Sequence, residues 1–199
     1  MALLELKNIS KAYYGNPILE DVSVSVASGS IFGILGVNGS GKTTLVRLLS
    51  GDLSPDAGEL IVDGQKITLS SPCDAMEQGI STIHQGSELI GRLTVAENVF
   101  IFGYNHSPKL FKRQSIKKIS ALAEELLHSL NIEVSALARA DEIDNATAQL
   151  VKIAAVMGQN PSVIIVDEPF AMLSSSQCDA VCELFRTIKQ RGVSILFTT

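Results

Sequence analysis

The sequence lacks the signals that direct a chain into or across a membrane. No apolar run approaches the roughly 20 residues that a helix needs to span a bilayer. The amino terminus also lacks the charged and then apolar pattern of a signal peptide. From these two absences we expect a cytosolic chain without a membrane-spanning segment of its own.

Cysteine and basic residues are scarce. The three cysteines are an odd number without metal-type spacing, which fits a reducing compartment. We interpret Cys178 and Cys182, on an expected helix, as small core-facing residues rather than a pair of metal ligands. The 16 Lys and Arg residues against 21 Asp and Glu residues give a formal net charge of −5. This balance argues against nucleic acid as the main partner, because phosphate neutralisation requires a basic face.

Repeats and low-complexity segments are absent as well. At 199 residues the chain can bury a real core, and we expect one domain with an inserted lobe. The sequence stops at Thr199, directly after an apolar run and without a polar tail. We expect this end to be a truncation.

The most specific feature that is present is a phosphate loop at residues 36–44. It reads Gly-Val-Asn-Gly-Ser-Gly-Lys-Thr-Thr, which matches G-x-x-x-x-G-K-[ST], between an expected strand and an expected helix. We expect Gly36, Gly39 and Gly41 to adopt φ values that other residues resist, so that N–H groups converge on phosphate oxygens. Lys42 would reach the β- and γ-phosphates, and Thr43 would offer its hydroxyl to Mg²⁺. The expected nucleotide contacts are Gly36, Asn38, Gly39, Ser40, Gly41, Lys42, Thr43 and Thr44.

The alternative for this loop is a glycine-rich turn that matches the motif by chance, and the flanking strand and helix disfavour it. Apolar periodicity predicts strands over residues 3–9, 18–26, 30–35, 59–62, 162–166 and 193–197. It predicts helices over residues 43–50, 94–103, 115–130, 145–158 and 176–190. Strands that alternate with helices around a phosphate loop predict an α/β fold with a mostly parallel core sheet.

A pair of carboxylates follows the apolar run over 163–166. Asp167 ends this expected strand at the sheet edge where ligands bind in α/β folds, and it is suited to hold Mg²⁺. Glu168 is suited to act as the general base for an attacking water. An acidic pair that merely ends a strand before Pro169 is the alternative, and the phosphate loop favours the functional interpretation.

Two further stretches carry a family resemblance. Residues 79–85 read Gly-Ile-Ser-Thr-Ile-His-Gln, and residues 93–99 read Leu-Thr-Val-Ala-Glu-Asn-Val. With the phosphate loop and Asp-Glu-Pro, this order resembles the ATP-binding subunits of ABC transporters. More narrowly, it is similar to the amino-terminal ATP-binding half of ribose-, galactose- and xylose-type sugar importer ATPases. The resemblance runs over nearly the whole chain.

The resemblance implies a P-loop NTPase fold with an antiparallel β subdomain and an inserted helical subdomain. The nucleotide-binding core would be residues 1–86 and 160–199, and the helical subdomain residues 87–159. It implies an ATPase that uses ATP and Mg²⁺ to energise solute import, for a simple sugar. The implied partners are membrane permease subunits, a second ATP-binding domain in a head-to-tail dimer and, indirectly, an extracytoplasmic solute-binding protein. The implied location is the cytoplasmic face of the inner membrane.

The resemblance also assigns residues. Tyr13 aligns with the aromatic residue that stacks on adenine, while Tyr14 and plain packing are the alternatives. Gln85 aligns with the glutamine that contacts Mg²⁺ and the attacking water and couples nucleotide state to the helical subdomain. His84 is expected to be structural. A soluble ABC-type ATPase and a regulatory module that does not hydrolyse nucleotide are the alternative functions.

The chain departs from the family pattern at the signature segment, residues 143–147. The family has a Leu-Ser-Gly-Gly-Gln type of sequence, which grips the ATP of the opposite subunit, whereas this segment reads Ile-Asp-Asn-Ala-Thr. Asp144 and Ala146 replace the serine and glycine, and a carboxylate repels a triphosphate. We predict that this surface does not complete an ATP site on its partner, although Asn145 is expected to cap a helix there. The family's switch histidine would follow Thr199, so this chain alone is expected to hydrolyse ATP poorly.

Overall fold

The computed structural model describes residues 2–104 and 115–199. The chain divides into two compact units, the first made of Met1–His84, Ser162–Glu168 and Lys189–Thr199, the second of Gln85–Pro161 and Pro169–Ile188. The second unit contains the predicted helical subdomain, residues 87–159, of which residues 105–114 lie outside the described residues. It also contains Pro169–Ile188, which the family resemblance assigns to the nucleotide-binding core.

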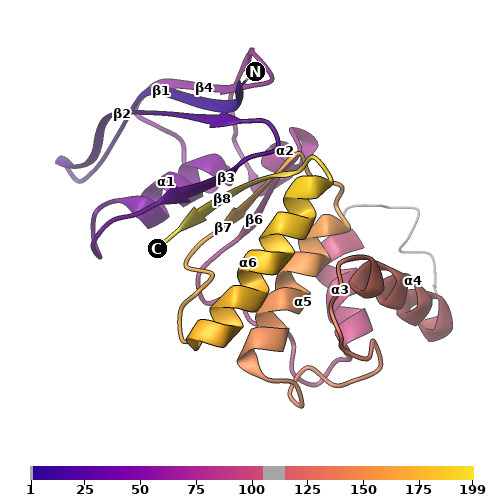
Figure 1. The fold of residues 1–199 in the computed structure, drawn as a ribbon. Coiled ribbons are helices and arrows are strands. Elements are labelled where there is room, and N and C mark those ends of the chain that lie inside the picture. The colour runs from indigo at the N-terminus through magenta and orange to yellow at the C-terminus, as the bar shows by residue number, and fades with distance from the viewer. Residues whose placement is uncertain (1, 105–114) are drawn as a thin grey trace. The chain divides into compact units, whose positions relative to one another are not determined.

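A parallel sheet forms the centre of the first unit (Figure 1). In spatial order its strands are β3 (Ile31–Ile34), β8 (Ser194–Thr198), β7 (Val163–Val166) and β6 (Ile80–Ile83). All four residues of β7 are buried, as a continuous run of Val and Ile predicts for a strand covered on both faces. Because β8 lies between β3 and β7 and all pairs are parallel, the carboxyl ends of these strands meet at one edge.

An antiparallel sheet completes the first unit. In spatial order its strands are β2 (Asn16–Ala27), β1 (Ala2–Tyr13), β4 (Ala57–Val62) and β5 (Gln65–Ile67). Side chains of both sheets and of helix α1 (Lys42–Leu49) form one hydrophobic core, which includes Leu4, Val26, Leu49 and Ile165. The predicted α/β fold with a parallel core sheet and an antiparallel β subdomain is therefore confirmed.

The second unit is helical where it is described. Its helices are α3 (Val95–Tyr104), α4 (Ile116–Ser129), α5 (Asn145–Met157) and most of α6 (Ser175–Gln190). Helix α3 packs against α4 and α5 (Figure 1). A Cβ atom at Gly103 would collide with the carbonyl oxygen of Ala155, so this glycine allows α3 and α5 to approach closely. Within the described residues, no helix combines the length and apolar character needed to cross a membrane.

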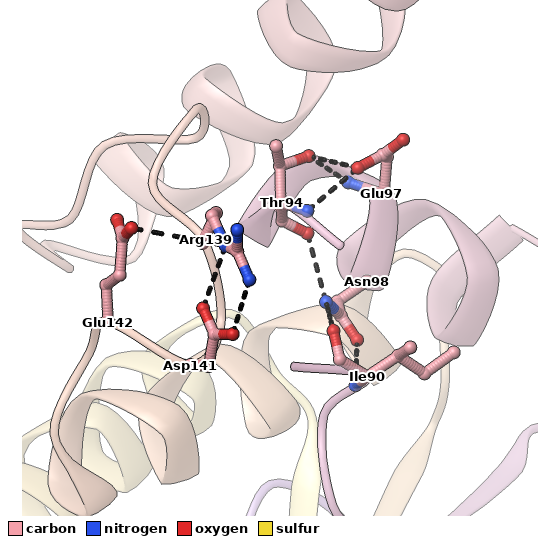
Figure 2. A network of polar contacts seen from close by, with 7 residues as sticks. All are labelled: Ile90, Thr94, Glu97, Asn98, Arg139, Asp141 and Glu142. Carbon is pink, nitrogen blue, oxygen red and sulfur yellow. Dashed lines mark hydrogen bonds and ion pairs between the residues drawn. The ribbon is translucent and has the colours of Figure 1, made fainter. Parts of the chain in front are cut away.

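The stretch over residues 93–99 forms the start of α3 (Figure 2). The Thr94 hydroxyl accepts the Glu97 N–H at 3.2 Å, and Glu97 Oε2 accepts the Thr94 N–H at 2.8 Å, which is a capping box. The fully buried Asn98 accepts the N–H of Ile90 at 2.7 Å and donates to its carbonyl oxygen at 3.2 Å. The polar residues of this stretch therefore fix the chain before α3.

Every strand and helix that periodicity predicts is present, with bounds that differ only at the ends. Periodicity did not predict β5, β6 or helix α2 (Pro72–Glu77). All three are short, and β6 carries Ser81 and Thr82 between two isoleucines. Such a four-residue pattern lacks both clean alternation and a continuous apolar run.

Candidate functional site

The phosphate loop lies between β3 and α1, and its glycines serve two different purposes. Gly39 and Gly41 have φ values of 82° and 92°, in the left-handed region that glycine tolerates best. Gly36 does not lie in that region, so the expectation that it is needed for its φ value is wrong. A Cβ atom at Gly36 would lie 2.6 Å from Ser40 Oγ, so this position requires glycine for space.

Gly41 also determines how α1 begins. A Cβ atom there would lie 2.8 Å from Leu19 Cδ2 and 3.1 Å from the Ile18 carbonyl oxygen, so the backbone packs directly on β2. Gly41 is the N-cap residue, and it supplies no side-chain cap. The first N–H groups of a helix have no intrahelical acceptor, so this start is suited to bind an anion.

Lys42 lies against the loop. Its side chain is largely buried, and Nζ donates to the carbonyl oxygens of Gly36 at 2.6 Å and Val37 at 3.2 Å. A phosphate bound by the loop would compete for the same ammonium group. Three of the other predicted contact residues are exposed, namely Asn38, Ser40 and Thr43, and Thr44 is half-buried.

Strand β8 joins the phosphate loop to the acidic pair. The N–H of Gly36 donates to the Thr199 carbonyl oxygen at 3.2 Å. The N–H of Thr199 donates to the Ile34 carbonyl oxygen at 3.0 Å. On the other side of β8, Val166 pairs with Phe197. The loop and the residues after β7 therefore flank the same strand end, as the sequence position of both motifs predicts.

Asp167 has one carboxylate oxygen bound and one left over. Its side chain is buried, and Oδ1 accepts the Thr198 hydroxyl at 2.5 Å. Oδ2 is buried and has no hydrogen-bond partner within the described chain. A buried carboxylate oxygen without a partner is unfavourable, and a cation or its bound water would satisfy it.

These residues fit Mg²⁺. In the part of the chain that the structure describes, no three His, Cys, Asp or Glu side chains gather into a metal-ligand cluster. Mg²⁺ does not require such a cluster, because it is usually held by one or two carboxylates together with substrate phosphates and water. Asp167 with the nearby phosphate loop provides that kind of site.

Glu168 has an unusual backbone. It is half-buried, its φ is 50°, and its N–H donates to the Thr198 hydroxyl at 3.0 Å. A left-handed backbone is uncommon for a residue other than glycine, and strained backbone of this kind recurs at active sites. The chain thus leaves the direction of β7 at the residue predicted to act as the base.

The two candidates for adenine stacking lie at the end of β1. Tyr13 is half-buried, whereas Tyr14 is fully exposed with a φ of 52°. Asp56 holds the chain just before them, because it accepts the Lys11 ammonium at 2.6 Å and the Ala12 N–H at 2.8 Å. These two hydrogen bonds, the one from Lys11 first, lower the pKa of Asp56. Neither tyrosine is excluded by its position.

His84 has a contact away from the phosphate loop. Its Nε2 lies 3.2 Å from Asp52 Oδ2, which also accepts the Ser50 hydroxyl at 2.7 Å. This contact ties the end of β6 to the turn after α1 and agrees with a structural role. Gln85 is the first residue of the second unit, and its contact with nucleotide stays a prediction.

The segment that follows Gln85 is attached to two helices of its own unit. Lys152 of α5 donates from Nζ to the Ser87 carbonyl oxygen at 3.0 Å. Burial lowers the pKa of Lys152. Asn98 of α3 holds Ile90 at the other end of the segment. The segment after Gln85 is therefore attached by hydrogen bonds to both α3 and α5.

The signature segment lies at the start of α5, where the helix is capped by Asp144. The carboxylate accepts the Thr147 N–H at 2.8 Å and the Thr147 hydroxyl at 3.2 Å. The bond from the Thr147 N–H lowers the pKa of Asp144. The prediction that Asn145 caps the helix is wrong, because Asn145 is the first helical residue. A carboxylate of the chain itself therefore occupies this helix start.

The sequence pattern does not identify Thr198 as a member of the site. Its hydroxyl contacts both Asp167 and the backbone of Glu168. The available signal was a polar residue at the carboxyl end of an apolar strand. That signal points to the site only once the strand order is known, because β8 lies next to β7, the strand that precedes Asp167.

Comparison with known proteins gives consistent matches. The model of the ABC transporter family matches residues 19–171. The chain is 36% identical over 195 residues to "Ribose import ATP-binding protein RbsA 1" of Rubrobacter xylanophilus, an alignment that covers 98% of this chain and 38% of that protein. It is 36% identical over 197 residues to the protein of the same name from Streptomyces avermitilis, which covers 99% and 37%. The chain thus spans well under half the length of these curated relatives.

Solved structures show the same fold. A nucleotide-free ATP-binding cassette from an ABC transporter matches with a TM-score of 0.87 at 27% identity, covering 100% of this chain and 81% of that one. The ADP conformation of an ATP-binding cassette of an ABC transporter matches with the same TM-score, identity and coverage. With the family model over most of its length, the chain belongs to the ABC transporter family.

Proposed function

We propose that this chain binds ATP with Mg²⁺ and hydrolyses it to energise sugar import by an ABC transporter. The observation that carries the proposal is the position of β8, which brings the phosphate loop and the Asp167–Glu168 pair to one sheet edge. The names of the relatives, ribose import ATP-binding proteins, support a sugar as the solute.

The loop and the start of α1 would bind the phosphates through backbone N–H groups. Lys42 exchanges its carbonyl partners for β- and γ-phosphate oxygens. Mg²⁺ would be held by the Thr43 hydroxyl, Gln85 and the unpartnered Oδ2 of Asp167. When bound, Mg²⁺ neutralises negative charge on the phosphates.

Glu168 accepts the proton of the attacking water, and Gln85 orients that water. The half-buried position of Glu168 at the strand end is compatible with a base beside the phosphate loop. The adenine ring stacks on Tyr13, with Tyr14 as the alternative, because a flat aromatic face suits a base with few hydrogen-bond demands.

The proposed assembly is a head-to-tail pair with a second ATP-binding domain on the cytoplasmic face of the inner membrane. Permease subunits contact the pair, and an extracytoplasmic solute-binding protein delivers the sugar. Asp144 places a negative charge where the family's signature serine meets phosphate. We infer that the ATP bound by this chain is hydrolysed, whereas the ATP that faces Asp144 is not.

Glu168→Gln tests the catalytic assignment. We expect the 199-residue chain to keep its ATP affinity and the assembled transporter to lose hydrolysis at this site by about 100- to 10,000-fold, the range for a lost general base. Glu133→Gln, which neutralises an exposed glutamate, serves as the matched control. Failure of the wild-type chain to bind ATP, or full hydrolysis by Glu168→Gln, would contradict the proposal.

A regulatory module that does not hydrolyse nucleotide is the second candidate, and the capping carboxylate of Asp144 favours it. Purification from membranes separates the two functions. The transporter function requires that the chain co-purifies with a polytopic permease and that the complex hydrolyses ATP. A stable complex that binds ATP without turnover would support the regulatory function instead.

A further inference from the structure

We infer that Thr198 is a positioning residue for ATP hydrolysis, because its buried hydroxyl sets the orientation of both the Asp167 carboxylate and the Glu168 backbone. This inference rests on the proposed function, in which Asp167 serves Mg²⁺ and Glu168 serves the attacking water. Neither the family resemblance nor the sequence pattern assigns Thr198 a role.

Thr198 lies between the phosphate loop and the Asp167–Glu168 pair. It is the last residue of β8, its side chain is fully buried, and it pairs with Ile34 just before the phosphate loop. Its Oγ1 donates to Asp167 Oδ1 at 2.5 Å and accepts the Glu168 N–H at 3.0 Å. A hydroxyl has one donor and two acceptor sites, so these two contacts fix its rotation.

The first contact leaves Asp167 with a defined free oxygen. Because Oδ1 is bound to Thr198, the carboxylate presents Oδ2, the oxygen that has no partner among the described residues. Rotation of the carboxylate would break a hydrogen bond to a charged acceptor, which is one of the stronger kinds. Thr198 thereby selects which oxygen faces a cation or its bound water.

The second contact holds the strained turn at Glu168. A φ of 50° is unfavourable for glutamate, and such a conformation persists when surrounding bonds hold it. The bond from the Glu168 N–H to Thr198 is one of them. The same hydroxyl thus sets the point at which the chain turns after Asp167.

A purely structural role explains Thr198 less well. Residues 195 and 196 of β8 are a fully buried isoleucine and leucine, the usual content of a strand in the middle of a parallel sheet. Valine has nearly the shape of threonine and would avoid burying a hydroxyl. The hydroxyl is explained by its two hydrogen bonds, one donated to Asp167 and one accepted from the Glu168 N–H. Both partners belong to the proposed catalytic pair.

The test compares Thr198→Val, which removes the hydroxyl, with Thr198→Ser, which keeps it. ATP affinity of the 199-residue chain is measured with a fluorescent ATP analogue, in Mg²⁺ and in EDTA. We expect Thr198→Val to reduce the Mg²⁺-dependent gain in affinity by about tenfold, the low end for a lost partner of a metal-holding carboxylate. Affinity in EDTA should stay unchanged, and Thr198→Ser should restore the gain.

The outcomes are distinguishable. A wild-type Mg²⁺ dependence that Thr198→Val leaves intact overturns the inference alone, as does a Thr198→Ser variant that behaves like Thr198→Val. A wild-type chain whose ATP affinity ignores Mg²⁺, with Asp167→Asn indistinguishable from it, overturns the proposed metal site and the inference with it. Thr198→Ala, which lacks the hydroxyl in a smaller side chain, replaces Thr198→Val if the latter fails to fold.

Discussion

Helices α1 and α5 both begin where the family resemblance places a phosphate, and they begin differently. At α1 the cap residue is Gly41, which supplies no side-chain acceptor. At α5 the cap residue is Asp144, whose carboxylate accepts the Thr147 N–H. Both starts present backbone N–H groups and the positive end of a helix dipole. Only the start of α1 leaves them to a ligand.

The comparison shows that helix geometry alone does not make a phosphate site. The side chains at the cap decide whether an external anion can enter. At α1 the glycine is followed by Lys42, a positive charge, whereas at α5 a negative charge already lies on the N–H groups. The start of α1 is open to a triphosphate, whereas at the start of α5 the Asp144 carboxylate already occupies the position of such an anion.

Lys42→Ala should have the largest effect, because it removes the positive charge from the open start. Hydrogen bonds to charged groups contribute about 1.5–3 kcal/mol, which corresponds to roughly a ten- to hundredfold loss of ATP affinity. Equilibrium titration of the chain with ATP measures this loss. Arg47→Ala is the matched control, since it removes an exposed basic residue from the same helix.

Equal ATP affinities for Lys42→Ala and Arg47→Ala would break the comparison. They would mean that the net charge of α1, rather than the ammonium group at the loop, attracts the nucleotide. The distinct hydrogen bonds of Lys42 to Gly36 and Val37 would then be part of the fold only.

The double variant Asp144→Ser with Ala146→Gly should open the second start. It removes the internal carboxylate and restores the residue types of the family signature. We expect hydrolysis of the ATP that faces this helix start to rise by up to about tenfold, the equivalent of about 1.4 kcal/mol from one regained phosphate contact. Unchanged ATPase activity and sugar transport would show that the asymmetry between α1 and α5 has no functional consequence.

Asp144→Ala should have the smallest effect, on stability alone. Loss of an N-cap costs about 0.5–2 kcal/mol, and the affinity of this chain for ATP should not change. Thermal unfolding at pH 7 measures the cost. Asp144→Asn is the control, because asparagine also caps helices but carries no charge.

The cost of Asp144→Ala should depend on pH. The folded state holds the pKa of Asp144 below its ordinary value, because the Thr147 N–H binds the charged form. The stabilisation is therefore complete above the unfolded pKa of about 3.9 and is lost as the pH falls through the lower folded pKa. The difference in Tm between wild type and Asp144→Ala should shrink below about pH 4. A constant difference down to pH 2.5 would contradict a charged cap.

The sequence was sufficient for features that depend on local pattern. The continuous apolar run of β7 and the spacing of the phosphate loop predicted both elements and the edge at which they meet. The strand β6 was missed because Ser81 and Thr82 interrupt its apolar residues. Its membership of the sheet is fixed by pairing with β7, which no local pattern encodes.

The errors within the site have the same origin. Gly36 requires glycine because Ser40 approaches it across the loop, and such an approach is a tertiary property. The cap of α5 is Asp144 rather than Asn145, a difference of one position between two residue types with equal capping preference. Thr198 was missed because its partners follow a neighbouring strand and lie about 30 residues away in sequence.

The place of β8 in the sheet has a consequence for how the domain is made. β3 is synthesised well before its parallel neighbour β8, which is the last strand of the described chain. Until β8 emerges, the backbone of β3 and of Gly36 lacks the strand that pairs with it. Closure of so long a loop is entropically costly and slow, so the glycine loop stays without its pairing strand while the residues between β3 and β8 are synthesised. A chaperone that protects this domain on the ribosome would therefore find an unpaired edge at β3.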